Sequence, residues 1–173
     1  AAFAQFHGQD VFAESTALVE AGGLPVEMIQ ALCLRPELLR AFAATGPGLY
    51  PGGLLERALK EKVILFSSQA NACQFCTDSH RALMRAVGIP PAQIDDLENP
   101  AHLTPRERLA LAYTEAVRAD ANRVSDALFA ELKGAFSDAE IVELTLLIGF
   151  INQLNWFNNA LRVTFHQEYA ENR

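Results

Sequence analysis

Two capping-box sequences mark where helices begin in the second half of the chain. Thr104-Pro105-Arg106-Glu107 places a capping threonine before a proline at the first helical position, and Ser137-Asp138-Ala139-Glu140 repeats the capping pattern. Apolar residues recur at helical spacing through most of the 173 residues, without a convincing alternating strand pattern. The sequence therefore predicts an all-α fold.

A glycine- and proline-rich segment, 46–53, is the strongest break in this helical pattern. Short helices are expected before it, and two longer ones, 54–70 and 73–87, directly after it. The second of these stops at Gly88, a residue that commonly ends helices. We expect a single domain over residues 1–173, built from an N-terminal helical cap (1–50), a core (54–88) and C-terminal helices (104–165).

The segment from Cys73 to His80 reads C-Q-F-C-T-D-S-H. Cys73, Cys76 and His80 stand at i, i+3 and i+7, so on a helix their side chains fall within an arc of roughly 60°. Thiols three residues apart can close a disulfide within one turn, and an imidazole on the same face can move protons on and off sulfur. The spacing indicates thiol redox chemistry.

Glu61 precedes Cys73 by twelve residues. If the helices on either side of Asn71 form an antiparallel hairpin, Glu61 comes alongside the cysteine and histidine face. There it would favour the imidazolium form of His80, and so a neighbouring thiolate, while the helix dipole acts on Cys73. After attack on an O–O bond, a sulfenic acid would condense with the second thiol, and an external dithiol would restore the pair. Glu61, Cys73, Cys76 and His80 are the candidate catalytic residues.

Two other interpretations of these four residues stay open. They could supply four zinc ligands, although the chain has neither two separated knuckles nor a Cys2His2 arrangement. They could also have a purely structural role, as two core cysteines and a histidine whose hydrogen-bonding groups all have partners. Cys33, among apolar neighbours, is expected to be an inert buried thiol. No glycine-rich phosphate loop precedes a helix, and we expect no cofactor.

The last predicted helix, from Ser137 to about Phe165, combines two unusual stretches. Between Leu144 and Ile151 it is apolar on nearly all sides, so its own chain or another subunit must cover it. It then becomes rich in amides, which need hydrogen-bond partners when buried. We expect these amides on a solvated or interface face rather than lining a substrate site; they are Asn152, Gln153, Asn155, Asn158 and Asn159.

Charge and hydropathy narrow the classes of partner. Fourteen basic against twenty-one acidic residues give a net charge of −7, and no basic run occurs, so nucleic acid and anionic membranes are poor candidates. The longest apolar run, 146–151, is too short to cross a bilayer, and the first residues lack a signal-peptide pattern. A soluble, cytoplasmic protein is expected.

The pattern E-x11-C-x2-C-x3-H, followed by a helix ending in glycine, resembles the alkylhydroperoxidase AhpD-like group of the carboxymuconolactone decarboxylase superfamily. It is carried here by Glu61, Cys73, Cys76, His80 and Gly88. The resemblance extends over about Pro36 to Val163 and includes L-T-P-R-E-R-L-A-L-A-Y-T-E-A-V and F-S-D-A-E-I-V-E-L-T-L-L-I-G-F-I-N-Q-L-N-W-F-N-N-A-L. It implies an AhpD-like multihelical fold, in which a helical hairpin carries the C-x-x-C motif and packs in an oligomeric bundle, a homo-trimer or homo-hexamer.

The resemblance also implies a thiol-dependent peroxidase that reduces hydroperoxides. Cys76 would attack the peroxide, Cys73 would resolve, and Glu61 with His80 would relay the proton; the dipole argument alone favours Cys73 as the attacker. The electron donor would be a lipoyl- or thioredoxin-type dithiol. The best-known members carry a further histidine immediately before the second cysteine, where this chain has Phe75.

Two further functions are weighed against this implication. The decarboxylase branch generally does without the C-x-x-C pair, so a lactone decarboxylase is not expected. The rival from another class is a non-catalytic oligomeric redox sensor or adaptor, with the apolar helix 146–151 as its assembly surface.

Overall fold

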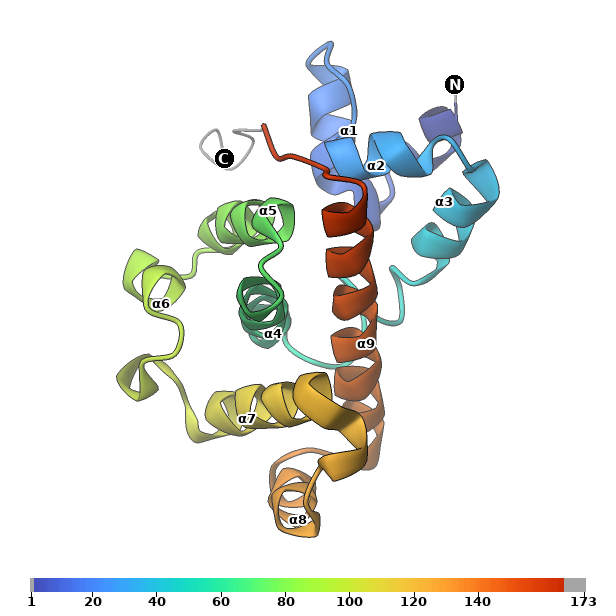
Figure 1. Ribbon diagram of the computed structural model, residues 1–173. Coiled ribbons are helices and arrows are strands. Elements are labelled where there is room, and N and C mark those ends of the chain that lie inside the picture. The colour runs from blue at the N-terminus through green and yellow to red at the C-terminus, as the bar shows by residue number, and fades with distance from the viewer. Residues whose placement is uncertain (1, 167–173) are drawn as a thin grey trace.

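The computed structural model describes residues 2–166, and within that range the chain is helical with connecting loops (Figure 1). The prediction of an all-α fold is confirmed. The α-helices are α1 (Ala13–Glu20), α2 (Glu27–Leu32), α3 (Pro36–Ala44), α4 (Arg57–Ala70), α5 (Gln74–Ala86), α6 (Pro91–Asp95), α7 (Pro105–Asp120), α8 (Asp126–Ala135) and α9 (Asp138–Ala160). Short 3-10 turns are η1 (Ala2–Phe6), η2 (Asp10–Phe12), η3 (Pro100–His102) and η4 (Ala121–Arg123).

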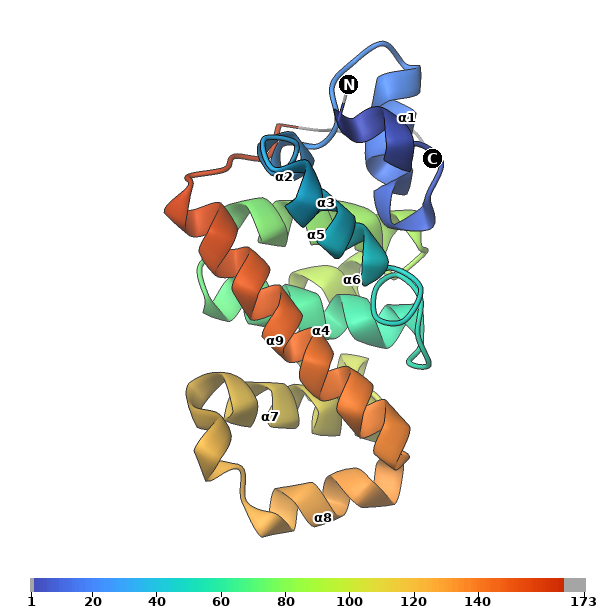
Figure 2. The ribbon, with the colours of Figure 1, turned by 90° about the vertical axis from the view of Figure 1, so that its right-hand side faces the viewer.

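Helix α4 is the centre of the main core. It packs against α5, α7 and α9, and Figure 2 shows α9 running obliquely across the other three. Leu59, Val63 and Leu65 of α4 are buried in the same apolar cluster as Leu147 and Ile148 of α9. Because α4 is surrounded on most sides, even its charged residues from Lys60 to Lys62 are buried. This enclosure places Glu61 deep inside the molecule.

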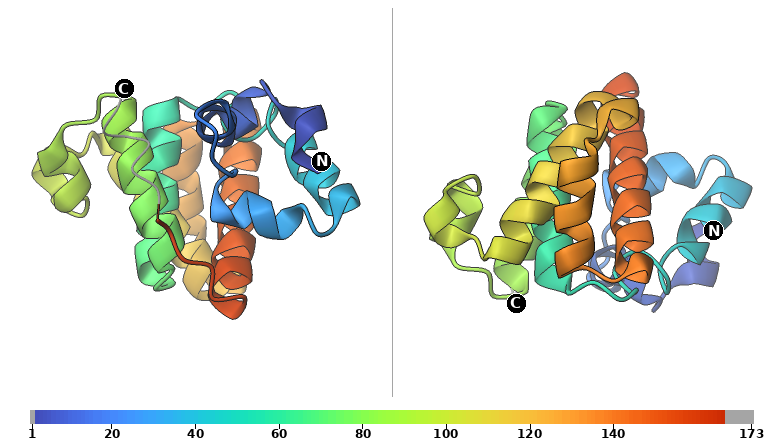
Figure 3. Two further views of the ribbon diagram at one scale, coloured as in Figure 1. Left: turned by 90° about the horizontal axis from the view of Figure 1, so that it is seen from above. Right: turned by 90° about the horizontal axis from the view of Figure 1, so that it is seen from below.

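The N-terminal elements α1, α2 and α3 form a cap on one side of α5 and α9 (Figure 3). A second apolar cluster holds the cap in place, with Phe12 and Leu39 fully or almost fully buried. The same cluster includes Cys73, Phe75 and Cys76 at the start of α5. The cap therefore covers the segment that carries the cysteines.

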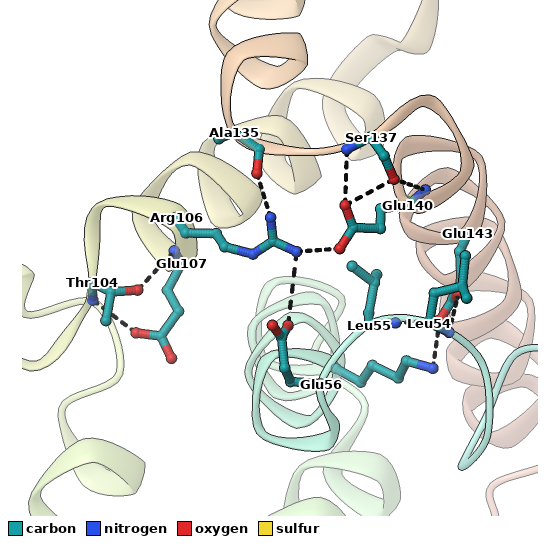
Figure 4. A network of polar contacts seen from close by, with 11 residues as sticks. Leu54, Leu55, Glu56, Thr104, Arg106, Glu107, Ala135, Ser137, Glu140 and Glu143 are labelled. Atoms are coloured by element: carbon teal, nitrogen blue, oxygen red, sulfur yellow. Dashed lines mark hydrogen bonds and ion pairs between the residues drawn. The ribbon is translucent and has the colours of Figure 1, made fainter.

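Both predicted capping boxes are present. The side chain of Thr104 caps α7 and that of Ser137 caps α9, each answered by a glutamate three residues later. Arg106, at the start of α7, donates to Glu140 of the second box at 2.6 Å and to the carbonyl of Ala135 at the end of α8 (Figure 4). The beginnings of α7 and α9 are thus tied to each other.

A buried ion pair fastens the loop before α4 to α9. Lys60 Nζ lies 2.5 Å from Glu143 Oε1 and donates to the carbonyl of Leu49 at 2.9 Å. The Glu143 carboxylate also accepts from the backbone N–H groups of Leu54 at 2.6 Å and Leu55 at 3.1 Å (Figure 4). Gly53 has a φ of +105°, and a side chain there would collide with this pair. The loop that carries Tyr50 is therefore held from both helices.

Some helix boundaries differ from the predicted ones. The helix expected from residue 54 begins at Arg57, because the Leu54 and Leu55 N–H groups bind Glu143 instead of starting a helix. Helix α9 ends at Ala160, before the predicted end at about Phe165. Just beyond the helix, Arg162 takes a positive φ of 54°. Across residues 2–166, no helix has both the length and the apolar character that a membrane span requires.

Candidate active site

The two cysteines lie at the turn between α4 and α5. Ala72, with a φ of 50°, reverses the chain direction, and Cys73 is the N-cap residue of α5. The Cys73 sulfur accepts the backbone N–H of Cys76 at 3.4 Å. Both residues are buried free thiols. At the N-cap position, the Cys73 sulfur lies at the positive end of the helix dipole, which favours a thiolate.

Glu61, on α4, meets His80, on α5, across the hairpin. Its Oε2 lies 2.7 Å from His80 Nδ1, and its Oε1 accepts from the Tyr50 hydroxyl at 2.7 Å and from Arg57 Nε at 2.5 Å. An ionised carboxylate can only accept, so the Nδ1 of His80 carries a proton and Nε2 is left to exchange one. The predicted hairpin therefore brings Glu61 behind the imidazole.

Arg57 and Tyr50 complete the surroundings of Glu61. Arg57 Nη2 donates to the Tyr50 hydroxyl at 2.8 Å, and the Tyr50 ring meets the His80 ring at a centroid distance of 5.7 Å. Burial raises the pKa of Glu61, but the charge and hydrogen bond of His80, with Arg57 and Tyr50, lower this pKa below its usual value. Glu61 is thus held as a carboxylate inside the protein.

The two thiols differ in how they hold a proton. A hydrogen bond from Cys76 lowers the pKa of Cys73 to about 7, against an opposing effect of burial. The same hydrogen bond, together with burial, raises the pKa of Cys76. In the resting pair the proton therefore stays on Cys76 while Cys73 carries negative charge near neutral pH.

Amides from α9 surround the cysteines, and the prediction of a solvated or interface face is wrong for three of the five. Asn152, Asn155 and Asn158 are buried, whereas Gln153 and Asn159 are exposed. Each buried amide has its own partners: Asn155 donates to Ser68 at 3.1 Å, and Asn158 donates to the Cys76 sulfur at 3.3 Å. The helix turns this amide face inward because α4 and α5 supply polar partners there.

A cavity of about 90 Å³ lies between the cap and the cysteine helix. Cys76 and His80 border it, and Cys73 does not. Its walls are mostly apolar and come from the cap, from α5 and from α9. Other residues on its surface include Phe12, Met28, Ile29, Phe42, Tyr50, Phe75, Ile151, Leu154 and Asn158.

Sequence reasoning missed three members of this site: Tyr50, Arg57 and Asn158. Arg57 could have been found, since its spacing of four residues from Glu61 on a helix predicts an ion pair. Tyr50 lies in the segment that the sequence marks only as a break between helices. Cys33, expected in the core, is only partly buried and packs at the edge of the second apolar cluster.

The metal interpretation gains no geometric support. Among residues 2–166, no group of three or more histidine, cysteine, aspartate or glutamate side chains is arranged to hold a metal ion. His80 directs Nδ1 at Glu61, and the sulfur of Cys73 binds a backbone N–H. The four residues instead form two linked pairs, carboxylate with imidazole and thiol with thiol.

Comparison with known proteins finds a matching family model for part of the chain and a shared fold. The model of the carboxymuconolactone decarboxylase family matches residues 36–116. A peroxidase-related protein from Silicibacter sp. TM1040 has a TM-score of 0.79 at 23% identity, over 90% of this chain and 84% of that one. A candidate AhpD antioxidant defence protein of unknown function from Agrobacterium tumefaciens has a TM-score of 0.72 at 29% identity, over 82% and 99%.

A third solved structure is that of a debrominase. The debrominase Bmp8 has a TM-score of 0.77 at 18% identity, over 98% of this chain and 89% of that one. At this identity the likeness concerns the fold. The chain is therefore similar to the carboxymuconolactone decarboxylase family over residues 36–116, and its fold is that of AhpD-like proteins.

Proposed function

We propose that this protein is a thiol-dependent peroxidase in which Cys73 and Cys76 cycle between dithiol and disulfide. The observation that carries the proposal is the meeting of Cys76 and His80 at one apolar cavity, with Glu61 2.7 Å behind the imidazole. A nucleophile, a proton carrier and a group that orients the carrier are the parts that such a reaction needs.

In the first step, the Cys76 thiolate attacks the terminal oxygen of a hydroperoxide. An S–O bond forms and the O–O bond breaks, so that Cys76 becomes a sulfenic acid and the peroxide is reduced. The leaving alkoxide takes a proton from His80 and departs as an alcohol. Glu61 keeps the imidazole in the tautomer and orientation that present Nε2 to the cavity.

In the second step, Cys73 attacks the Cys76 sulfur. His80, now neutral, accepts the Cys73 proton, the S–S bond forms, and the hydroxide that leaves takes this proton to become water. One hydroperoxide and two thiols thus give an alcohol, water and a disulfide. A dithiol donor, lipoyl- or thioredoxin-type, then reduces the disulfide.

Peroxide-dependent loss of thiols tests the proposal. We expect one equivalent of an alkyl hydroperoxide to remove the thiols of Cys73 and Cys76 and leave Cys33 free, as counted with a thiol reagent and located by peptide mass spectrometry. With a dithiol donor, many equivalents of peroxide should be consumed per chain. Thiols that persist in excess peroxide would refute the peroxidase.

The same experiment separates the rival, a redox sensor or adaptor. A sensor would be oxidised once, slowly, and would not consume further peroxide with a dithiol donor present. Its oxidation would instead change the mass of the assembly or the binding of a partner. Sustained turnover excludes this alternative, and a single stoichiometric oxidation supports it.

The assembly that accompanies this function is proposed to be a homo-oligomer built on α9. Val142, Leu146 and Trp156 leave 60%, 61% and 66% of their surface exposed on this helix, and Leu54 nearby leaves 65%. Large apolar side chains gathered on one face commonly mark an interface. Leu54, Val142 and Leu146 border an open groove between α9 and the loop before α4.

Replacing Leu146 by glutamate should therefore lower the oligomeric mass measured by sedimentation. A buried charge at an apolar interface is strongly unfavourable, whereas an exposed one is tolerated. Glutamate at Phe129, which is 40% exposed on α8, is the matched control and should leave the mass unchanged. A monomeric parent protein, or an unchanged mass in Leu146→Glu, would contradict the assignment.

A further inference from the structure

Asn158 occupies an unusual position for an asparagine. It lies near the end of α9 with only 1% of its surface exposed, and it borders the cavity beside Cys76. Its Nδ2 lies 3.3 Å from the Cys76 sulfur and 3.5 Å from the Met28 sulfur. Its Oδ1 is buried and accepts no hydrogen bond from any residue within 2–166. Buried amide oxygens are rarely left in this state, because an unmet acceptor is destabilising.

The thiol pair presents a difficulty that this amide can resolve. Near neutral pH the negative charge rests on Cys73, whose sulfur is fully buried and does not border the cavity. The cysteine that borders the cavity is Cys76, whose sulfur holds the proton. A thiolate reacts only with an oxygen that it can touch, so charge must move from Cys73 to Cys76 before attack.

We propose that Asn158 is a catalytic residue that stabilises negative charge on Cys76 and binds the hydroxyl end of the substrate. This inference rests on the proposed peroxidase function. The Nδ2–H group donates to the sulfur that faces the cavity, and an N–H donor favours a thiolate over a thiol. The sulfur of Cys73 accepts a backbone N–H in the same way, so each of the two sulfurs has an N–H donor of its own.

The reaction can be followed atom by atom at this amide. The proton shared by the two thiols passes from Cys76 to Cys73, and the charge on Cys76 is met by Asn158 Nδ2–H. Asn158 Oδ1 accepts the O–H of the peroxide's terminal oxygen, which is the oxygen that the Cys76 sulfur attacks. When the O–O bond breaks, that oxygen becomes the hydroxyl of the sulfenic acid, and its hydrogen bond to Oδ1 is kept.

Alkylation of Cys76 tests the role without requiring peroxidase activity. Iodoacetamide reacts with thiolates, so its rate at Cys76, followed by peptide mass spectrometry, reports the charge on that sulfur. We expect Asn158→Leu to slow this reaction by about tenfold or more at neutral pH, the effect of losing a hydrogen bond to a charged group. Asn158→Asp keeps the size and removes the donor, and it should slow the reaction further.

Asn159 offers a matched control on the same helix. It is exposed, and its amide donates to the carbonyl of Asn71 at 3.1 Å rather than to a sulfur. Asn159→Leu should alkylate at the parent rate. A purely structural role for Asn158 would lower the melting temperature and leave the alkylation rate of Cys76 unchanged in both Asn158 variants, which would overturn the inference. If Asn158→Leu does not fold, Asn158→Asp decides.

Peroxide measurements separate this inference from the proposed function. If the parent protein does not reduce hydroperoxides but alkylation depends on Asn158, the activity is wrong and the effect on Cys76 stands. If the parent is a peroxidase, Asn158→Leu should lower kcat/KM for tert-butyl hydroperoxide by at least the factor seen in alkylation, because substrate contact is lost as well. Equal kcat/KM in Asn158→Leu and the parent would refute the catalytic role.

Discussion

Replacing Cys76 by serine should abolish peroxide reduction, with a loss of more than about 10³-fold in kcat/KM. The serine hydroxyl is far less acidic than a thiol and cannot be oxidised to a sulfenic acid. Cys76 is singled out because its sulfur borders the cavity and that of Cys73 does not. This placement outweighs the lower pKa of Cys73, about 7, because a thiolate that cannot touch the peroxide cannot attack it.

The companion variant Cys73→Ser should behave differently. Cys76 can still be oxidised once, but the sulfenic acid has no partner and should accumulate, where dimedone can trap it. Turnover with a dithiol donor should be lost or severely slowed. Cys33→Ser, a change at the edge of the cap, is the control and should retain activity. Accumulation of the sulfenic acid on Cys73 in Cys76→Ser would reverse the assigned order.

Replacing Lys60 by methionine should destabilise the protein by about 3–5 kcal/mol, the usual effect of leaving a buried charge without its partner. Glu143 would keep its two backbone donors but lose the ammonium group at 2.5 Å. For a chain of this length, the melting temperature should fall by about 10 °C. Urea unfolding and calorimetry measure the two effects.

The pH dependence of the folding stability offers a second check on the Lys60 variant. Burial raises the pKa of Glu143, but Lys60 and the Leu54 and Leu55 N–H groups lower it below the ordinary value of 4.5. A carboxyl with a lowered folded-state pKa stabilises the protein above its unfolded pKa, and this stability is lost as the pH falls through the folded pKa. The difference between parent and Lys60→Met should therefore shrink as the pH falls below 4.5 and Glu143 of the parent becomes protonated.

An exposed pair at the junction of α8 and α9 serves as the control. Lys133 and Asp138 lie 3.7 Å apart with 55% and 86% of their side-chain surfaces exposed. Lys133→Met should change the free energy of unfolding by less than about 1 kcal/mol. If Lys60→Met were equally mild, the buried pair would not be what fastens the loop carrying Tyr50.

Local signals predicted the helices well, because a helix start depends on neighbours in sequence. Thr104 and Ser137 bind N–H groups three residues away, so their capping boxes could be recognised without a structure. The start of α4 could not be located in the same way. It depends on Glu143, which lies 88 residues from Leu55 along the chain.

The same difference between local and long-range contacts explains which residues of the candidate site could be predicted. Cys73, Cys76 and His80 share one helix, and the hairpin brings Glu61 to them over a short loop, so helical geometry sufficed. Asn158 lies 82 residues from Cys76. Its amide could be assigned to the site only once the packing of α9 against α5 was known. A dense group of amides beside an apolar helix was the available signal, and solvent exposure was the wrong interpretation of it.

The walls of the cavity come from residues both inside and outside the range that the family model matches. The family match covers residues 36–116, which include both cysteines, Glu61 and His80. Much of the apolar wall lies outside that range: Val11, Phe12, Val26, Met28 and Ile29 before it, and Phe150, Ile151 and Leu154 after it. The hairpin that carries the two cysteines, Glu61 and His80 and much of the apolar wall therefore lie on separate stretches of sequence. Substitutions near the two ends of the chain can therefore reshape the cavity while the hairpin that carries the cysteines stays as it is.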